Sequence, residues 1–188
     1  MSGLMRLLFA GGLLFAMTAC KTVDTVGGYY GSSLAPGAKI EVIQELQVPP
    51  GLARIYLQYG QTMQYTAVDQ YQPFCYFLMR QPLPVVQSIH PGIFLITAVL
   101  VDDVDVRLSL PVRVAGELSY ASSTGRGPLA WQTFMELSAA DQPEVKTLVC
   151  SGAYASPALA EPVRLDEIGR VFGELATVRV QVIRPAGQ

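Results

Sequence analysis

The stretch Ala53–Tyr59 (ARIYLQY) alternates between two sets of residues with a period of two. One set is Ala53, Ile55, Leu57 and Tyr59, and the other is Arg54, Tyr56 and Gln58. Because successive side chains of a β-strand point to opposite faces, this pattern predicts a half-buried strand. The run Pro49-Pro50-Gly51 precedes it and separates it from an earlier strand.

The same alternation recurs on both sides of this stretch. It is clearest in Asp105–Leu118 (DVRLSLPVRVAGEL), where valine or leucine occupies alternate positions from Val106 to Val114. Proline cannot donate to a β-ladder, so Pro111 indicates an edge strand or a bulge. Residues 177–182 alternate in a similar way, and residues 40–46 do so with an interruption at Ile43 and Gln44. Further strand candidates are Cys75–Met79, Pro84–Ile89, Trp131–Leu137 and Lys146–Cys150.

Ile93–Val101 (IFLITAVLV) has no polar alternation. Such a run is typical of a strand buried on both faces or of a short buried helix. Its isoleucine and valine content favours the strand, as does the Pro91-Gly92 turn before it.

Arg164–Gly173 (RLDEIGRVFG) departs from the period of two, because its apolar residues recur at helical spacing. Asp166 lies four residues before Arg170, so the two side chains can meet on one helix face. Gly173 can adopt the left-handed conformation that ends a helix. The segment predicts a short helix before the final strand.

Many short strands separated by turn residues are typical of an all-β domain. We expect a mainly β fold, either an antiparallel sandwich or a barrel-like domain, with one short C-terminal helix. The chain has 188 residues, and 51% of them are hydrophobic, which is enough for a sizeable core. Its net charge of −2 and the lack of a basic run argue against nucleic-acid binding, which depends on phosphate neutralisation.

The N-terminus reads MSGLMRLLFAGGLLFAMTACK. Arg6 precedes the apolar run Leu7–Met17, which is shorter than the roughly 20 residues that a membrane-spanning helix needs. A basic residue, a short apolar run and small residues after it are typical of a secretory leader.

The motif Met17-Thr18-Ala19-Cys20 resembles the lipobox of bacterial lipoproteins, although that class usually has leucine where Met17 stands. The resemblance covers only the first 21 residues. It implies a signal peptide over residues 1–19, acylation of Cys20 and hence a lipid bilayer as partner, since two or more acyl chains anchor stably. Lys21, in place of the aspartate that retains such proteins on the inner membrane, implies an outer-membrane lipoprotein facing the periplasm.

Residues 20–37 are rich in Gly, Ser and Thr, and we interpret them as a lipidated, flexible tether. Residues 38–188 are then a single β-rich periplasmic domain. Export to an oxidising compartment predicts a disulfide between the two remaining cysteines, Cys75 and Cys150. The alternative is a reactive or metal-binding thiol.

No motif for catalysis, phosphate binding or a dinucleotide is present, and we predict no cofactor and no metal site. His90 is the single histidine, and we expect it on the surface before a type II turn at Pro91-Gly92. Asp102, Asp103 and Asp105 offer oxygen ligands, but such clusters are common in turns between strands.

Seven aromatic residues fall between positions 56 and 77. Tyrosine combines a flat apolar face with a hydroxyl group, which suits contacts to proteins and glycans. The alternative is that aromatic residues are simply favoured in strands. The candidate binding face is Tyr56, Tyr59, Tyr65, Tyr71 and Tyr76.

An anchor, a tether and a β domain without a catalytic motif favour one function above others. We expect an envelope lipoprotein with a binding or structural role in an envelope protein assembly, and therefore an envelope protein partner. The alternatives are an envelope enzyme that acts on glycan or peptide through converged carboxylates, or a small-ligand carrier with a deep apolar cavity.

Overall fold

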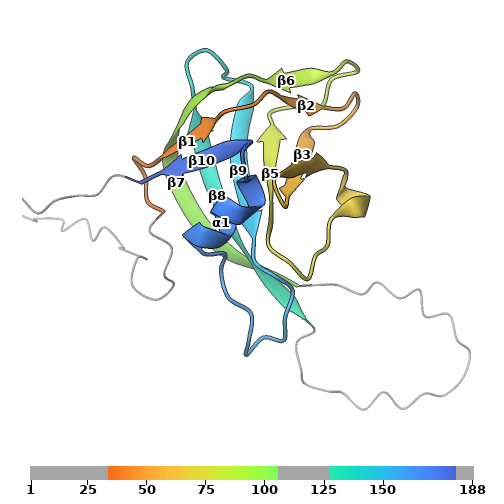
Figure 1. Cartoon of the computed structure of the whole chain (residues 1–188), viewed down its shortest axis with the longest axis vertical. Helices are drawn as coiled ribbons and strands as arrows, with labels where there is room; N and C mark the ends of the chain where they lie inside the picture. The colour runs from red at the N-terminus through yellow and green to blue at the C-terminus, as the bar shows by residue number, and fades with distance from the viewer. Residues whose placement is uncertain (1–33, 106–127, 181–188) are drawn as a thin grey trace, which may run out of the picture.

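The computed structural model describes residues 34–105 and 128–180 (Figure 1). Strands β1–β5 are Lys39–Val42, Leu46–Val48, Arg54–Gln58, Gln61–Met63 and Phe74–Met79. Strands β6–β10 are Gln87–Ile89, Gly92–Asp105, Leu129–Ser138, Val145–Ser151 and Ala176–Arg179. The helices are the short 3₁₀ turn η1 (Tyr65–Ala67) and α1 (Leu165–Phe172).

Eight strands form one curled antiparallel sheet in the order β10-β1-β7-β8-β9-β5-β3-β4. The sheet curves into a half-barrel, and β2 pairs with β6 as a separate ribbon beside it (Figure 1). The predicted mainly β, barrel-like fold with one helix near the C-terminus is therefore confirmed.

The concave face of this sheet carries the main hydrophobic core. In β5, Cys75, Phe77 and Met79 belong to the core, while the residues between them face the other way. Phe77 and Phe94 are fully buried there, and their ring centroids lie 6.5 Å apart. The same period of two that predicted the strands thus separates the two faces of the sheet.

Helix α1 closes the open side of the half-barrel. It packs against β10 near one end of the strand order and against β3 and β5 near the other, burying Ile168 and Phe172. At its C-terminus, Gly60 donates a backbone hydrogen bond of 2.9 Å to Val171. A Cβ on Gly173 would lie only 2.7 Å from the Cα of Gly60, so this close approach requires glycine.

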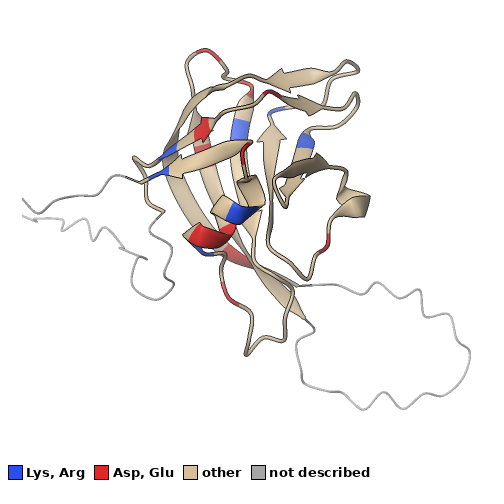
Figure 2. Cartoon of the chain, viewed as in Figure 1, with Lys and Arg blue, Asp and Glu red and all other residues tan. Residues whose placement is uncertain are grey.

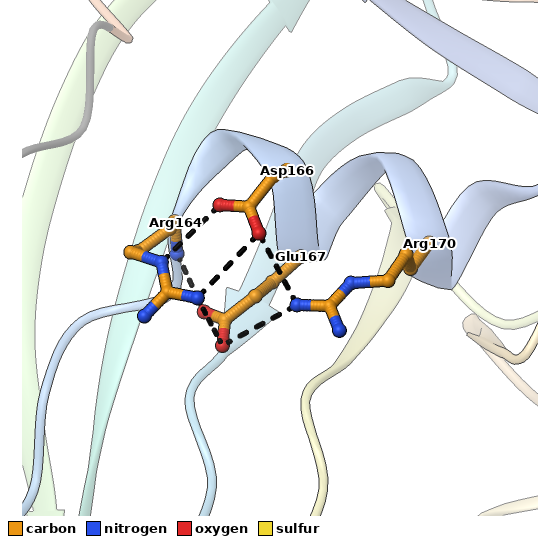
Figure 3. Close-up of polar contacts among 4 residues, drawn as sticks. All are labelled: Arg164, Asp166, Glu167 and Arg170. Carbon is orange, nitrogen blue, oxygen red and sulfur yellow. Dashed lines mark hydrogen bonds and ion pairs between the residues drawn. The ribbon is translucent and has the colours of Figure 1, made fainter.

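Helix α1 carries charged residues (Figure 2), and the side chains of Asp166 and Arg170 are exposed. Arg170 lies 3.2 Å from Asp166, as the spacing predicts, and Arg164 contacts Asp166 as well (Figure 3). The hydrogen bond from Arg164 is the main reason that the pKa of Asp166 is lowered. Gly173 ends the helix at φ 54° and ψ −122°, so its φ is positive but its conformation is not the predicted left-handed one.

Cys75 and Cys150 form a disulfide, as predicted. They are direct partners in the β5–β9 ladder, and both are fully buried in the main core. The bridge therefore ties neighbouring strands at the centre of the sheet.

The strand predicted at Ile93–Val101 forms within β7, but the prediction that both of its faces are buried is wrong. Phe94 and Ile96 are fully buried, whereas Ile93 and Leu100 are 53% and 63% exposed on the convex face. The register shifts between Ile96 and Ala98, so the bulge moves later residues to the opposite parity. The run lacks polar alternation because both faces of this sheet carry apolar side chains.

Three other boundaries differ from the sequence predictions. Residues 40–46 divide between β1 and β2, and only Gln87–Ile89 of Pro84–Ile89 forms a strand. Leu34, inside the predicted tether, is 7% exposed and packs in the main core, so residues 34–37 belong to the folded domain. The predicted leader and most of the strand predicted at Asp105–Leu118 lie outside the described residues.

Candidate functional site

The convex face of the sheet carries a continuous row of apolar side chains across six strands. Each member is the direct ladder partner of the next. The row is Met63, Tyr56, Tyr76, Val149, Phe134 and Leu100. Since the charged fraction of the chain is only 15%, apolar residues on the second face are the expected consequence of its composition.

Aromatic rings gather where this row crosses β3 and β5. The centroid of Tyr56 lies 5.3 Å from that of Tyr65, 5.2 Å from that of Tyr76 and 6.3 Å from that of Phe74. These tilted pairs fall within the range in which aromatic rings attract one another. Tyr56, Phe74 and Tyr76 form a second hydrophobic cluster with Val68 and Val149, separate from the main core, and the ring of Tyr65 lies at its exposed side.

One buried amide holds the loop that carries Tyr65. The Nε2 of Gln58 donates to the carbonyl oxygens of Asp69 at 2.8 Å and Pro73 at 3.2 Å. Its Oε1 accepts from the backbone N–H of Asp69 at 3.0 Å. Gln58 is 1% exposed, and its side-chain amide bonds to backbone groups of the loop as a neighbouring strand would. These bonds hold residues 64–73 against β3.

A second loop completes the site from the other side. The backbone N–H of Tyr154 donates to the carbonyl of Gln70 at 2.9 Å, and this bond joins the loop after β9 to the loop after β4. The side chain of Gln70 in turn donates to the hydroxyl of Tyr65 at 2.8 Å. Tyr154 therefore lines the same groove as Tyr65, although 89 positions separate them in the sequence.

The resulting groove follows β3 and has a cavity volume of about 790 Å³. Its aromatic lining residues are Tyr56, Tyr65, Phe74, Tyr76 and Tyr154. The size lies within the range of roughly 300–1,000 Å³ that ligand pockets occupy.

Arg54 is the one charged side chain among the described residues that line this groove. Its Cζ lies 5.1 Å from the ring centroid of Tyr76, which is a cation–π contact. Its interaction with the side chain of Tyr56 is the main reason that the pKa of Arg54 is raised.

Burial raises the pKa of both Tyr76 and Tyr154. Desolvation disfavours the charged phenolate, so both hydroxyl groups stay protonated at neutral pH and can donate hydrogen bonds. The groove therefore presents one cation and several neutral donors on an aromatic floor.

Three of the five predicted face residues meet in this groove, namely Tyr56, Tyr65 and Tyr76. Tyr59 does not lie on the strand face, because it adopts a φ of 55° in the two-residue turn between β3 and β4 and is 63% exposed. Tyr71 is 71% exposed and also lies outside the groove. Cys20 lies outside the described residues.

Arg54 and Tyr154 are site residues that the sequence analysis did not include. Arg54 could have been found, because it shares the parity of Tyr56 in the alternation that opens the sequence analysis. Tyr154 carried no sequence signal, since only the hydrogen bond between two loops brings it to the groove.

The other candidates occupy surface positions. His90 is exposed, as expected, and its Nδ1 lies 4.0 Å from a carboxylate oxygen of Glu45. The predicted type II turn at Pro91-Gly92 is wrong, because Gly92 has no positive φ and begins β7. Asp102 and Asp103 lie within β7 and not in a turn. Within residues 34–105 and 128–180, no three His, Cys, Asp or Glu side chains cluster as metal ligands, and no helix is long and apolar enough to cross a bilayer.

Comparison with protein-family models, with curated proteins and with solved structures finds no match to this chain.

Proposed function

We propose that this protein is a lipid-anchored binding protein of the bacterial cell envelope, which holds a partner protein in the groove along β3. The observation that carries the proposal is the groove itself, where four tyrosines surround an arginine that pairs with no carboxylate among the described residues. Tyrosine and arginine are the residues most enriched at the energetic centres of protein interfaces.

The surrounding structure supports a preformed site. The floor of the groove belongs to β3 and β5, and the disulfide at Cys75 fixes β5 to β9 directly behind it. Gln58 holds the covering loop with its three bonds to Asp69 and Pro73. A rigid site binds more tightly, because less conformational entropy is lost when a partner docks.

The anchor would set where this binding occurs. An acylated Cys20 would tether the domain to a membrane, and Lys21 implies the periplasmic face of the outer membrane. Tethering raises the effective concentration of the groove near other envelope proteins, so even a modest intrinsic affinity can support an assembly.

A small-ligand carrier is the second candidate, and the cavity volume of about 790 Å³ favours it. The groove offers no support for an enzyme with two catalytic carboxylates, because its described lining residues include neither Asp nor Glu. The two binding functions differ in whether the occupant is a protein.

The test is site-specific photocrosslinking of the full-length protein in native membranes. A photoreactive residue at Thr62, which lines the groove, should crosslink to one partner protein. Tyr65→Ala should abolish the crosslink, because it removes a ring from the site while η1 contains no buried residue. Tyr71→Ala is the matched control, an exposed tyrosine outside the groove, and should leave the crosslink intact.

A Cys20→Ala form tests the anchor in the same experiment, and we expect it to lose the crosslink in cells. A crosslink that survives Tyr65→Ala would remove the groove from the proposal. A wild-type protein that crosslinks to no protein, but retains a small molecule through purification, would favour the carrier.

A further inference from the structure

Resting on the proposed function, we propose that the groove recognises an extended, acidic peptide segment of the partner. One carboxylate of this segment would bind Arg54, and a neighbouring apolar or aromatic side chain would lie between the rings of Tyr56, Tyr65 and Tyr76.

The charge of Arg54 is the first step of the argument. Among the described residues, no carboxylate lies within ion-pair distance of its guanidinium, whereas Arg164, Arg170 and Arg179 have such partners. Arg80 also lacks a carboxylate partner, but its Nε donates to the carbonyl of Pro143 at 2.6 Å, and it lies outside the groove. The acidic residue in its own cross-strand row is Glu136, three strands away and so roughly 14 Å distant. The groove thus holds an uncompensated positive charge, which favours an anionic ligand.

The shape and surroundings of the Arg54 guanidinium favour a carboxylate as the anion that binds it. The Cζ of its guanidinium lies 5.1 Å from the ring centroid of Tyr76, and no hydrogen bond from its N–H groups to a described residue is present, so these donors can reach a ligand. The planar fork of a guanidinium suits the planar, bidentate geometry of a carboxylate. The protonated hydroxyls of Tyr76 and Tyr154 can donate to the same ligand.

The position of the groove at the sheet edge favours a peptide over other carboxylates. Strand β4 is the last strand of the large sheet, and within the described residues its outer edge pairs with no other strand. Thr62 and Met63 of this strand line the groove. An open edge offers backbone donors and acceptors to an extended peptide, while the pockets beside it select alternate side chains.

The distribution of charged residues over the described part of the molecule also supports an acidic ligand in the groove. Acidic and basic residues lie on α1 and are scattered over the other elements (Figure 2). The described groove residues include no acidic side chain that would repel the carboxylate. A single cation on an aromatic floor therefore selects one negative charge next to an apolar group.

The test is selection from a phage library of random dodecapeptides, with the purified full-length protein as bait. The wild-type protein should enrich sequences in which Asp or Glu adjoins an aromatic or aliphatic residue. Arg54→Gln should lose the acidic preference, because it removes the charge while leaving an uncharged polar side chain. Arg170→Gln, an exposed arginine on α1 outside the groove, is the matched control and should keep it.

A synthetic peptide of the selected sequence then gives the magnitude. Its Kd should rise at least about tenfold for Arg54→Gln, and by a similar factor when Asn or Gln replaces its acidic residue. The combination of both changes should add little further loss, because they remove the same contact. Unchanged thermal unfolding of Arg54→Gln shows that the variant is folded.

Three results would overturn the inference. They are enrichment without acidic residues, acidic enrichment that Arg54→Gln retains, and no enrichment at all. Arg54-dependent binding of a uronate glycan or a fatty acid, measured in parallel, would assign the anion to another class. If the Tyr65-dependent crosslink persists in any of these cases, the proposed function stands and only the ligand chemistry is wrong.

Discussion

The two faces of strands β3, β5 and β9 differ in chemistry, although alternate residues of the same strands form both faces. The concave face carries aliphatic residues, Phe77 and the disulfide, all closed off by α1. The convex face carries tyrosines, Phe74 and Arg54, covered only by two loops and open to a groove. In β3 and β5 the odd-numbered residues therefore serve stability and the even-numbered ones recognition.

The largest expected effect comes from the adjacent pair Phe77 and Tyr76, which point to opposite faces of β5. Phe77→Ala should lower the free energy of unfolding by about 3–5 kcal/mol, because it leaves a closed cavity in the main core. Urea unfolding followed by the fluorescence of Trp131, the single tryptophan, measures this loss.

Tyr76→Ala is the matched change on the other face, and it should cost only about 2 kcal/mol. The space that it creates opens into the groove, where water fills it. The variant therefore loses the free energy of burying the ring but does not leave an empty cavity, which would cost more. Equal losses for the two variants would show that the convex cluster is as closed as the core.

The disulfide gives the next largest effect. Replacing Cys75 and Cys150 together by Ala should lower the free energy of unfolding by roughly 2–4 kcal/mol, since the bridge constrains a long loop in the unfolded chain. Because the bridge lies on the concave face, binding at the groove should persist in the fraction that stays folded. Thermal unfolding and the crosslink at Thr62, measured on one preparation, separate the two properties.

The two faces also explain how much of the fold the sequence could predict. Alternation predicted β3, because a period of two survives where one face is more apolar than the other, and the sequence also offered strand candidates that form within β5, β8 and β9. It failed on the burial of β7, where Ile93 and Leu100 are apolar but face outward. The type of a residue indicates whether its side chain favours burial, but it does not indicate whether another part of the protein covers the face on which that side chain lies.

The site was less predictable than the fold for a related reason. Tyr56 and Tyr76 lie opposite each other because strand pairing places them so, and clustering in sequence was a fair indication of that. Tyr59 lies apart from the groove because the alternation in the sequence continues one residue beyond the strand, into a turn that Gly60 permits. Tyr154 joins from a distant loop through a backbone hydrogen bond, and residue type carries no information about such a bond.

Gln58 links the two faces, because it is buried like a core residue but holds the loop of the binding groove. Gln58→Leu should lower the free energy of unfolding by about 1–2 kcal/mol, since it leaves the carbonyls of Asp69 and Pro73 without their donor. Hydrogen exchange should rise in residues 64–73 and not in β9. Unchanged exchange in this loop, together with an intact crosslink, would show that Gln58 does not position the site.

The smallest expected effect is a gain on the concave face. The hydroxyl of Thr133 is fully buried opposite Cys150 and is the one buried side-chain polar atom without a hydrogen-bond partner in the described part of the chain. Thr133→Val keeps the shape and removes the unsatisfied group, so it should raise the free energy of unfolding by about 1 kcal/mol and Tm by about 2–4 °C. Thr147→Val, on the convex face of β9, is the control and should change the free energy by less than about 0.5 kcal/mol. A loss of stability in Thr133→Val would mean that this hydroxyl has a partner, such as a bound water, and that the concave core is less dry than its apolar lining indicates.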